Sequence, residues 1–164
     1  MEIRAARAED AAAVAEIYND GIRERTSTFE TRERQPAEIA ERIGTERFPF
    51  LVAELDGRVA GWAAASEYSS RDVYAGVAEC SVYVDRELRG RRIGTALLAA
   101  LAEESARRGF HKLVGKLFAS NEASMRLVER GGFRVVGTHL GHGTLDGEWR
   151  DVILVERPWL ASQP

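Results

Sequence analysis

The chain has 164 residues, of which 45% are hydrophobic and 30% charged, so it fits one globular domain over residues 1–164 rather than two. Its 23 Lys and Arg against 26 Asp and Glu give a net charge of −3, without the basic excess of a nucleic-acid or anionic-membrane binder. The single cysteine, Cys80, excludes an intrachain disulfide and a cysteine-based zinc site, and we expect no metal. No stretch approaches the roughly 18 apolar residues of a membrane span, and the N-terminus lacks the apolar core of a signal peptide. We therefore expect a cytoplasmic protein with no nucleic-acid or membrane partner.

Periodicity and turn residues predict a first strand, two helices and then three strands in the N-terminal half. Pro36 begins the second helix, because proline is favoured at the first helical position. Asp56 and Gly57 separate two apolar runs and give the strongest short hairpin signal of the sequence. The strands are expected at residues 2–6, 50–55, 58–66 and 78–84, and the helices at 9–25 and 36–47.

The C-terminal half is predicted to alternate helices and strands before it ends in a second hairpin. Gly109 stops one helix in the C′ position, and Asn121 is a good N-cap for the next. Asp146 and Gly147 mark the hairpin turn. The helices are expected at residues 95–108 and 121–130, and the strands at 113–118, 133–140 and 149–156. The order is β-α-α-β-β-β-α-β-α-β-β, a mixed α/β domain around a central sheet.

The most specific local feature is the sequence RGRRIG at residues 89–94, between a predicted strand and a predicted helix. Glycines let the backbone approach a ligand, and the first turn of a helix presents unpaired N–H groups and the positive end of its dipole. This arrangement binds a pyrophosphate, and Arg89, Arg91 and Arg92 add charge of the matching sign. The P-loop lysine and the Rossmann glycine pattern are both missing. The alternative is a helix that happens to begin with basic residues.

Glu79 is a carboxylate in the middle of an apolar strand. Strand alternation places it on one face with Val77, Ser81 and Tyr83, whereas Cys80 lies on the other face as a small buried residue. A charge in such a strand is costly unless it is paired or used. Glu79 could take the proton from an attacking amine as a general base. The alternative is an ion pair with a neighbouring arginine.

The remaining candidates carry weaker signals. Arg71 together with Tyr74 could bind a substrate carboxylate through the forked guanidinium, or Arg71 could be a solvated loop residue. Phe29 stands alone in a polar segment and is either a pocket wall or a dimer contact. The three histidines do not show metal-ligand spacing.

Two motifs, VYVDRELRGRRIGTALL and NEASMRLVERGGF, resemble those of the GNAT superfamily of acetyl-CoA-dependent N-acetyltransferases, and the resemblance spans essentially the whole chain. More narrowly, IYNDGI, TFET, RDVYAGVAECSVYV and GEWRDV are similar to the branch that acts on phosphinothricin, arsinothricin and methionine sulfone or sulfoximine. The resemblance implies an α/β fold with a mostly antiparallel central sheet, splayed between the fourth and fifth strands and flanked by helices. It also implies acetyl-CoA as the co-substrate and a homodimer.

The resemblance implies roles for particular residues of this chain. Glu79 matches the general base proposed for the branch, and Phe29, Arg71 and Tyr74 match the substrate end. The backbone of residues 82–84 would pair with the pantetheine arm, and the helix-start turn would hold the pyrophosphate. The residues implied to bind acetyl-CoA are Val82, Tyr83, Val84, Arg89, Gly90, Arg91, Arg92, Ile93, Gly94, Thr95, Asn121 and Ser124.

The sequence departs from the family pattern in three places. Arg92 stands where many members have glycine, and arginine costs energy there if the residue needs a positive φ. The motif MRLVERGGF has no tyrosine where many members have one that protonates the leaving thiolate. Leu145 and Asp146 precede Gly147 where phosphinothricin-type relatives tend to have a basic residue or histidine, which bears on the specific substrate.

We therefore expect an enzyme that transfers acetyl from acetyl-CoA to the primary amine of a small amino-acid-like substrate, by direct attack within a ternary complex. One alternative is an acetyltransferase acting on a protein or peptide N-terminus. A second, from another class, is a non-catalytic acyl-CoA-binding module with a regulatory role.

Overall fold

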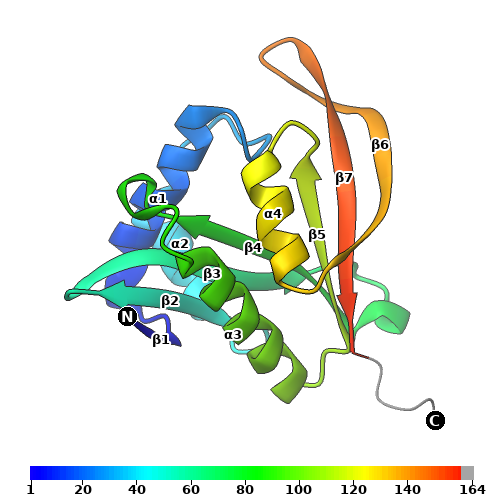
Figure 1. Cartoon of the computed structure of the whole chain (residues 1–164). Helices are drawn as coiled ribbons and strands as arrows, with labels where there is room; N and C mark the ends of the chain where they lie inside the picture. Colours follow the sequence, from blue (N-terminus) through cyan, green and yellow to red (C-terminus); the bar gives the residue numbers. More distant parts are fainter. Residues whose placement is uncertain (160–164) are drawn as a thin grey trace.

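The computed structural model describes residues 1–159, in which strands and helices follow one another in the predicted order (Figure 1). The strands are β1 (Glu2–Ala5), β2 (Phe50–Leu55), β3 (Arg58–Glu67), β4 (Val77–Val84), β5 (Lys112–Phe118), β6 (Arg134–Leu145) and β7 (Glu148–Pro158). The helices are α1 (Ala11–Glu24), α2 (Pro36–Ile43), α3 (Ile93–Arg107) and α4 (Glu122–Arg130).

The strands form one mixed sheet in the order β1-β2-β3-β4-β5-β7-β6. Neighbouring strands are antiparallel except β4 and β5, which run parallel. Both predicted hairpin turns are present. In each turn the aspartate and the glycine have positive φ (Asp56 51° and Gly57 78°, Asp146 52° and Gly147 81°), which matches the right-handed twist of the paired strands.

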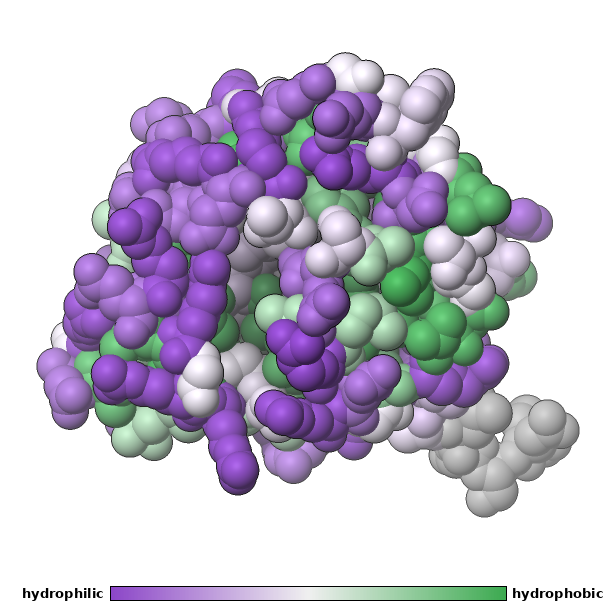
Figure 2. All heavy atoms as spheres, turned by 45° about the horizontal axis from the view of Figure 1, so that its top comes forward, coloured by the Kyte–Doolittle hydropathy of each residue, from purple (hydrophilic) through white to green (hydrophobic). Residues whose placement is uncertain are grey.

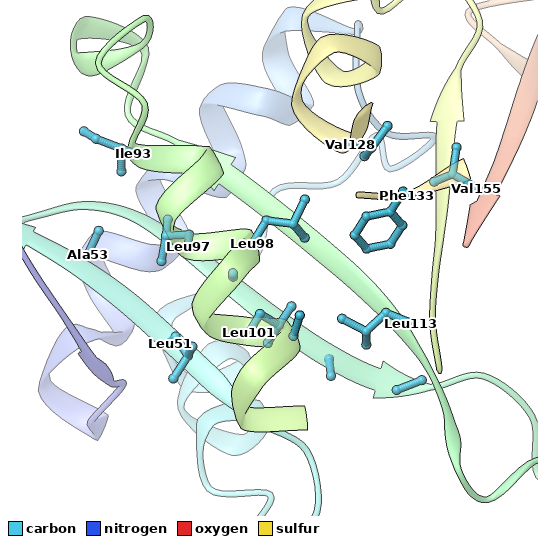
Figure 3. Close-up of a cluster of buried hydrophobic side chains, with 14 of the residues drawn as sticks. Leu51, Ala53, Ile93, Leu97, Leu98, Leu101, Leu113, Val128, Phe133 and Val155 are labelled. Atoms are coloured by element: carbon cyan, nitrogen blue, oxygen red, sulfur yellow. The ribbon is translucent and has the colours of Figure 1, made fainter. Parts of the chain in front are cut away.

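Helices cover both faces of the sheet, α3 and α4 in front and α1 and α2 behind in the view of Figure 1. The front core is built on the leucines of α3, and Figure 3 shows Leu97, Leu98 and Leu101 packed towards Leu113 of β5 and Phe133. Behind the sheet, residues of α1 and α2 enclose Trp62, which is 1% exposed. Burial of these two apolar layers provides the main stabilisation of the fold.

Most predicted boundaries agree with the observed ones to within two residues, and two do not. The helix expected to reach residue 47 ends at Ile43, because Gly44 caps it and Pro49 disfavours helical backbone just before it. The strand expected to end at residue 140 continues to Leu145 after an irregular register between His139 and Gly143. Gly141, with a φ of 53°, lies in this irregular segment, which is a bulged part of one long strand rather than its end.

Candidate active site

The sheet opens between its fourth and fifth strands, as expected. Within residues 1–159, β5 lies beside β4 only from Val77 to Glu79, although β4 continues to Val84. Further along, β5 pairs with β7 on its other side as far as Phe118. The edge of β4 that faces the opening can therefore pair with an extended ligand that carries amide groups, in the manner of an added strand.

A cavity of about 430 Å³ lies at this opening, between the turn before α3 and the start of α4. Arg91 is the one residue of the predicted acetyl-CoA set that does not line it. The lining residues are Glu24, Thr26, Ser27, Val82, Tyr83, Val84, Leu88, Arg89, Gly90, Arg92, Ile93, Gly94, Thr95, Asn121, Ala123, Ser124, Arg126, Leu127 and Arg130. We call this space the first cavity.

The first cavity carries a net positive charge. Its arginines outnumber its one acidic residue, Glu24, which is paired with Arg89 at 3.0 Å. Arg126 and Arg130 of α4 were not predicted. They lie four residues apart and therefore on one face of α4, the face that lines the cavity. That spacing is the sequence signal that could have identified them.

The turn before α3 adopts the conformation that an anion site needs. Gly90 and Arg92 have φ of 81° and 63°, and Arg92 is the N-cap residue of α3. The N–H groups of the first helical turn therefore point out of the helix end, where its dipole also favours negative charge. These donors and the arginines fit the diphosphate of acetyl-CoA, and the free edge of β4 fits its amide-containing arm.

Asn121 fastens the start of α4 to the loop that follows α1. Its Oδ1 accepts a hydrogen bond from the backbone N–H of Ser124 at 3.0 Å, the N-cap role that the sequence predicts. Its Nδ2 donates to the carbonyl oxygen of Thr26 at 3.0 Å. One side chain thus fixes two walls of the first cavity relative to each other.

A second cavity of about 300 Å³ joins the first, because Ser27, Val82, Tyr83 and Ser124 line both. It holds the predicted residues Phe29 and Glu79. The remaining lining residues are Tyr18, Thr28, Glu30, Cys80, Ser81, Lys116, Leu117 and Phe118. Two ligands bound in the two cavities would meet at the shared residues.

Glu79 is not the buried carboxylate that the apolar strand suggested. Its side chain is 29% exposed, and Oε2 accepts a hydrogen bond from Nζ of Lys116 at 2.8 Å. The partner is a lysine rather than the arginine considered from the sequence. Glu79 is in register with Val114, so the side chain of Lys116, two residues along β5, lies on the same face of the sheet.

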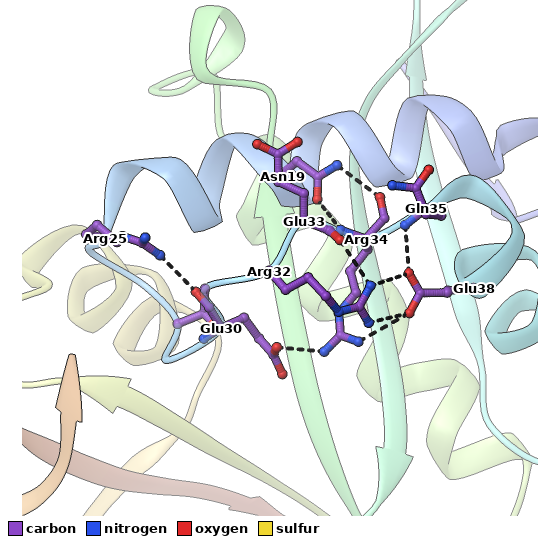
Figure 4. A network of polar contacts seen from close by, with 9 residues as sticks. Asn19, Arg25, Glu30, Arg32, Glu33, Arg34, Gln35 and Glu38 are labelled. Atoms are coloured by element: carbon purple, nitrogen blue, oxygen red, sulfur yellow. Dashed lines mark hydrogen bonds and ion pairs between the residues drawn. The ribbon is translucent and has the colours of Figure 1, made fainter. Parts of the chain in front are cut away.

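Ion pairs hold the loop that carries Phe29 (Figure 4). The amide of Asn19 in α1 accepts from the N–H of Arg34 at 2.8 Å and donates to its carbonyl oxygen at 3.1 Å. The carboxylate of Glu30 pairs with Arg34 at 2.7 Å, and Glu38 pairs with Arg32. The wall of the second cavity is therefore a fixed structure, tied to α1 and α2.

Phe29 is a pocket wall. Its ring contacts Phe118 edge to face, with centroids 4.7 Å apart, and Phe118 packs on Leu145 and Val152. Leu145, which departs from the family pattern, thus supports this wall through its contact with Phe118. Asp146, which departs from the pattern at the next position, forms an ion pair with Arg25 at 3.2 Å.

Burial raises the pKa of two side chains of β4, the phenol of Tyr83 and the thiol of Cys80. Tyr83 stacks on Trp62 with centroids 4.9 Å apart, and its pKa lies well above the ordinary value despite the hydroxyls of Ser27 and Thr28. Burial, with the nearby charge of Glu79, raises the pKa of the Cys80 thiol to about 12. Cys80 therefore stays protonated at neutral pH and is a poor nucleophile.

Arg71 and Tyr74 line neither cavity. Both lie in the connection between β3 and β4, where the guanidinium carbon of Arg71 is 5.8 Å from the centroid of the Tyr74 ring. Conversely, sequence reasoning passed over Lys116, because a lone lysine in a strand carries no motif.

The described part of the chain holds no group of three or more His, Cys, Asp or Glu placed to bind a metal ion. None of its helices combines the length and the apolar character that crossing a membrane requires.

The sequence matches the family described as acetyltransferase (GNAT) domain over residues 3–154. It is 34% identical to a phosphinothricin N-acetyltransferase of Streptomyces viridochromogenes, over 100% of this chain and 91% of that protein.

Two solved structures show the same fold. A phosphinothricin acetyltransferase from Sinorhizobium meliloti, in complex with acetyl-CoA, is 31% identical with a TM-score of 0.90, over 96% of this chain and 88% of that one. A ribosomal-protein-alanine N-acetyltransferase from Brucella melitensis is 32% identical with a TM-score of 0.92, over 96% and 99% of the two chains.

Proposed function

The chain belongs to the GNAT family of acetyl-CoA-dependent N-acetyltransferases, and we propose that its acceptor is the primary amine of a small amino-acid-like molecule. The observation that carries this proposal is the junction of the two cavities at Ser27, Val82, Tyr83 and Ser124, with Glu79 in the second cavity. One cavity fits acetyl-CoA, and the other is a small space lined by charged and aromatic side chains.

On the cofactor side, the residues of the first cavity bind and orient. The turn with Gly90 and Arg92 and the first turn of α3 would hold the diphosphate, and the edge of β4 around residues 82–84 would pair with the pantetheine arm. Asn121 and Ser124 would lie towards the sulfur end, since Ser124 lines both cavities. Acetyl-CoA supplies the acetyl group as a thioester.

On the amine side, Glu79 is the general base. An amine attacks a thioester only through its free electron pair, so its ammonium proton must first leave. Glu79 is the β4 carboxylate of the second cavity, and it is 29% exposed, so it can pass the proton on to solvent. Transfer is direct, because holding both substrates at the junction supplies much of the rate without a covalent enzyme intermediate.

Tyr83 is a wall of the junction rather than the acid that protonates the thiolate. A phenol whose pKa is raised by burial is a weaker acid than a thiol, whose ordinary pKa is about 8.5. Proton transfer from Tyr83 to a thiolate would therefore be unfavourable, whereas a hydrogen bond from its hydroxyl would not.

Thiol release from acetyl-CoA by the purified protein tests the proposal. Phosphinothricin, L-methionine sulfone, a plain amino acid and a peptide with a free N-terminal alanine are supplied in separate reactions, and the products are identified by mass. We expect rapid release with one of the first two compounds and a product heavier by one acetyl group. Acetyl-CoA binding without thiol release from any compound would overturn the proposal in favour of a binding module.

The peptide acceptor is the second candidate, because the chain is also 32% identical to the ribosomal-protein-alanine N-acetyltransferase. Release with the peptide alone would establish this acceptor in place of the small amine. The volume of the second cavity, about 300 Å³, favours the small molecule.

We also propose a homodimer that associates through the β6–β7 hairpin. Figure 2 shows hydrophobic residues gathered on that side of the molecule. Leu140 is 80% exposed and Trp149 is 71% exposed, and Val135 and Val136 are about half exposed. Such a patch marks a protein-binding surface. Light scattering should give twice the monomer mass, and Leu140→Glu should give the monomer.

A further inference from the structure

Two charged groups of the second cavity, the carboxylate of Glu79 and the ammonium of Lys116, balance each other. Glu30, Glu79 and Lys116 contribute charge to its lining, but Glu30 is already balanced by Arg34 at 2.7 Å. One carboxylate and one ammonium group remain, and they face each other at 2.8 Å across the opening between β4 and β5.

The Glu79–Lys116 pair is not needed to hold the fold. The two side chains are 29% and 47% exposed, and ion pairs at such exposure contribute little to stability. Beyond Glu79 the strands no longer pair, so this bridge spans the mouth of the opening rather than a closed part of the sheet. A pair in this position is free to exchange partners when a charged ligand enters.

We propose that Lys116 is the residue that selects amines bearing a carboxylate, by binding the carboxylate of a zwitterionic amino acid. This inference rests on the proposed function, since it assigns the acceptor's second contact in the same site. The substrate carboxylate takes Lys116 away from Glu79, and the substrate ammonium takes its place. One exposed ion pair is thereby replaced by two, and Glu79 is left in contact with the proton that it must remove.

Lys116 is better placed than Arg71 for this contact. Arg71 lines neither cavity, whereas the Nζ of Lys116 is already within hydrogen-bond distance of Glu79. An amine without a carboxylate offers Lys116 no replacement partner, so its ammonium group must compete with Lys116 for Glu79. We therefore expect it to bind weakly even when its size and shape are right.

The test compares L-methionine sulfone with its carboxamide, in which a neutral amide replaces the carboxylate, at a pH low enough to keep both α-amines protonated. Binding of each is measured by calorimetry in the presence of CoA, for the wild type, Lys116→Met, Lys116→Arg and Arg71→Ala. Thiol release from acetyl-CoA is measured in parallel on the same four proteins. We expect the wild type to bind the acid about 10- to 100-fold more tightly than the carboxamide, the usual worth of a charge-assisted hydrogen bond. Lys116→Met should abolish that preference, and Lys116→Arg and Arg71→Ala should retain it.

The inference is overturned if Lys116→Met leaves the preference unchanged, if it weakens both ligands equally, or if Arg71→Ala is the variant that removes the preference. Failure of the wild type to bind either ligand would also overturn it. A preference that depends on Lys116, without thiol release from any protein, would instead contradict the proposed function and leave Lys116 as the carboxylate-binding residue.

Discussion

Phe29 lies so close to Gly143 of β6 that a Cβ atom at residue 143 would come 2.8 Å from Cε1 of the Phe29 ring. The ring forms a wall of the second cavity, and the glycine is therefore what allows it to lie there. A feature of the last hairpin thus sets the position of a side chain from the first third of the chain.

Replacing this glycine should damage the amine site alone. Gly143→Ala should push the Phe29 ring from its place and raise KM for the amine about tenfold, because small displacements at a reacting site are costly. KM for acetyl-CoA should not change. Gly137→Ala is the matched control, because a Cβ at that position in the same strand meets no atom within 4 Å. Equal effects of the two substitutions would contradict the proposed role of Gly143.

Glu79→Gln removes the proposed base with little change in shape. We expect kcat to fall by about 10²- to 10⁴-fold, the usual contribution of a positioned base, with KM for acetyl-CoA unchanged. Glu67→Gln is the control, because Glu67 is an exposed carboxylate of neighbouring β3 that lines neither cavity. A Glu79→Gln variant within threefold of the wild type would show that another group, or solvent, removes the proton.

Arg92→Gly should have opposite effects on stability and on cofactor binding. Arg92 has a φ of 63°, and relieving that conformation should raise the free energy of unfolding by about 0.5–1 kcal/mol, after the entropic cost of glycine. Loss of a guanidinium from the first cavity should weaken acetyl-CoA binding several-fold. Urea unfolding and calorimetry measure the two effects.

Arg91→Gly is the control for Arg92, because Arg91 lies in the same turn, has no positive φ and does not line the cavity. It should not stabilise the protein, and it should leave acetyl-CoA binding close to the wild-type value. If both glycine variants bind acetyl-CoA as the wild type does, the charge of the turn does not hold the cofactor.

Asp10 gives the stability of the protein a dependence on pH. Two hydrogen bonds from Arg4, at 2.7 and 2.9 Å, hold the pKa of this carboxyl below its ordinary value of 3.8. A lowered folded-state pKa means that the stabilisation is complete above the unfolded pKa and is lost as pH falls through the folded one. Asp10→Asn should therefore cost about 2 kcal/mol at pH 7 and progressively less below about pH 4.

Chemical unfolding at pH 7 and pH 3 measures this difference. Asp20→Asn is the control, because Asp20 pairs with the exposed Arg23 and should cost less than about 1 kcal/mol at either pH. A cost of Asp10→Asn that is the same at both pH values would show that ionisation of Asp10 does not stabilise the fold.

Much of the fold could be predicted because local signals decide it. The Asp-Gly pairs at 56–57 and 146–147, which separate apolar runs, both stand at hairpin turns, and Asn121 caps the helix that it was expected to cap. The turn before α3 was predicted for the same reason, since its glycines and its place between strand and helix are visible in the sequence. Arg92 does have a positive φ, which is the condition under which arginine is expected to cost energy at this position.

The partners of the site residues could not be predicted, because they depend on distant pairings. Lys116 reaches Glu79 only through the parallel register of β4 and β5, which a sequence pattern does not specify. The closeness of Phe29 to Gly143 likewise depends on where the β6–β7 hairpin lies. The predicted substrate roles of Arg71 and Tyr74 came from resemblance, and neither residue lines a cavity.

The central claim is that the joined cavities hold both substrates at once and that acetyl passes directly between them. Initial rates of thiol release, with acetyl-CoA varied at several fixed concentrations of the accepted amine, test this claim most directly. The account predicts double-reciprocal lines that intersect, as a ternary complex requires. Parallel lines would reveal an acetylated enzyme intermediate, and they would contradict direct transfer.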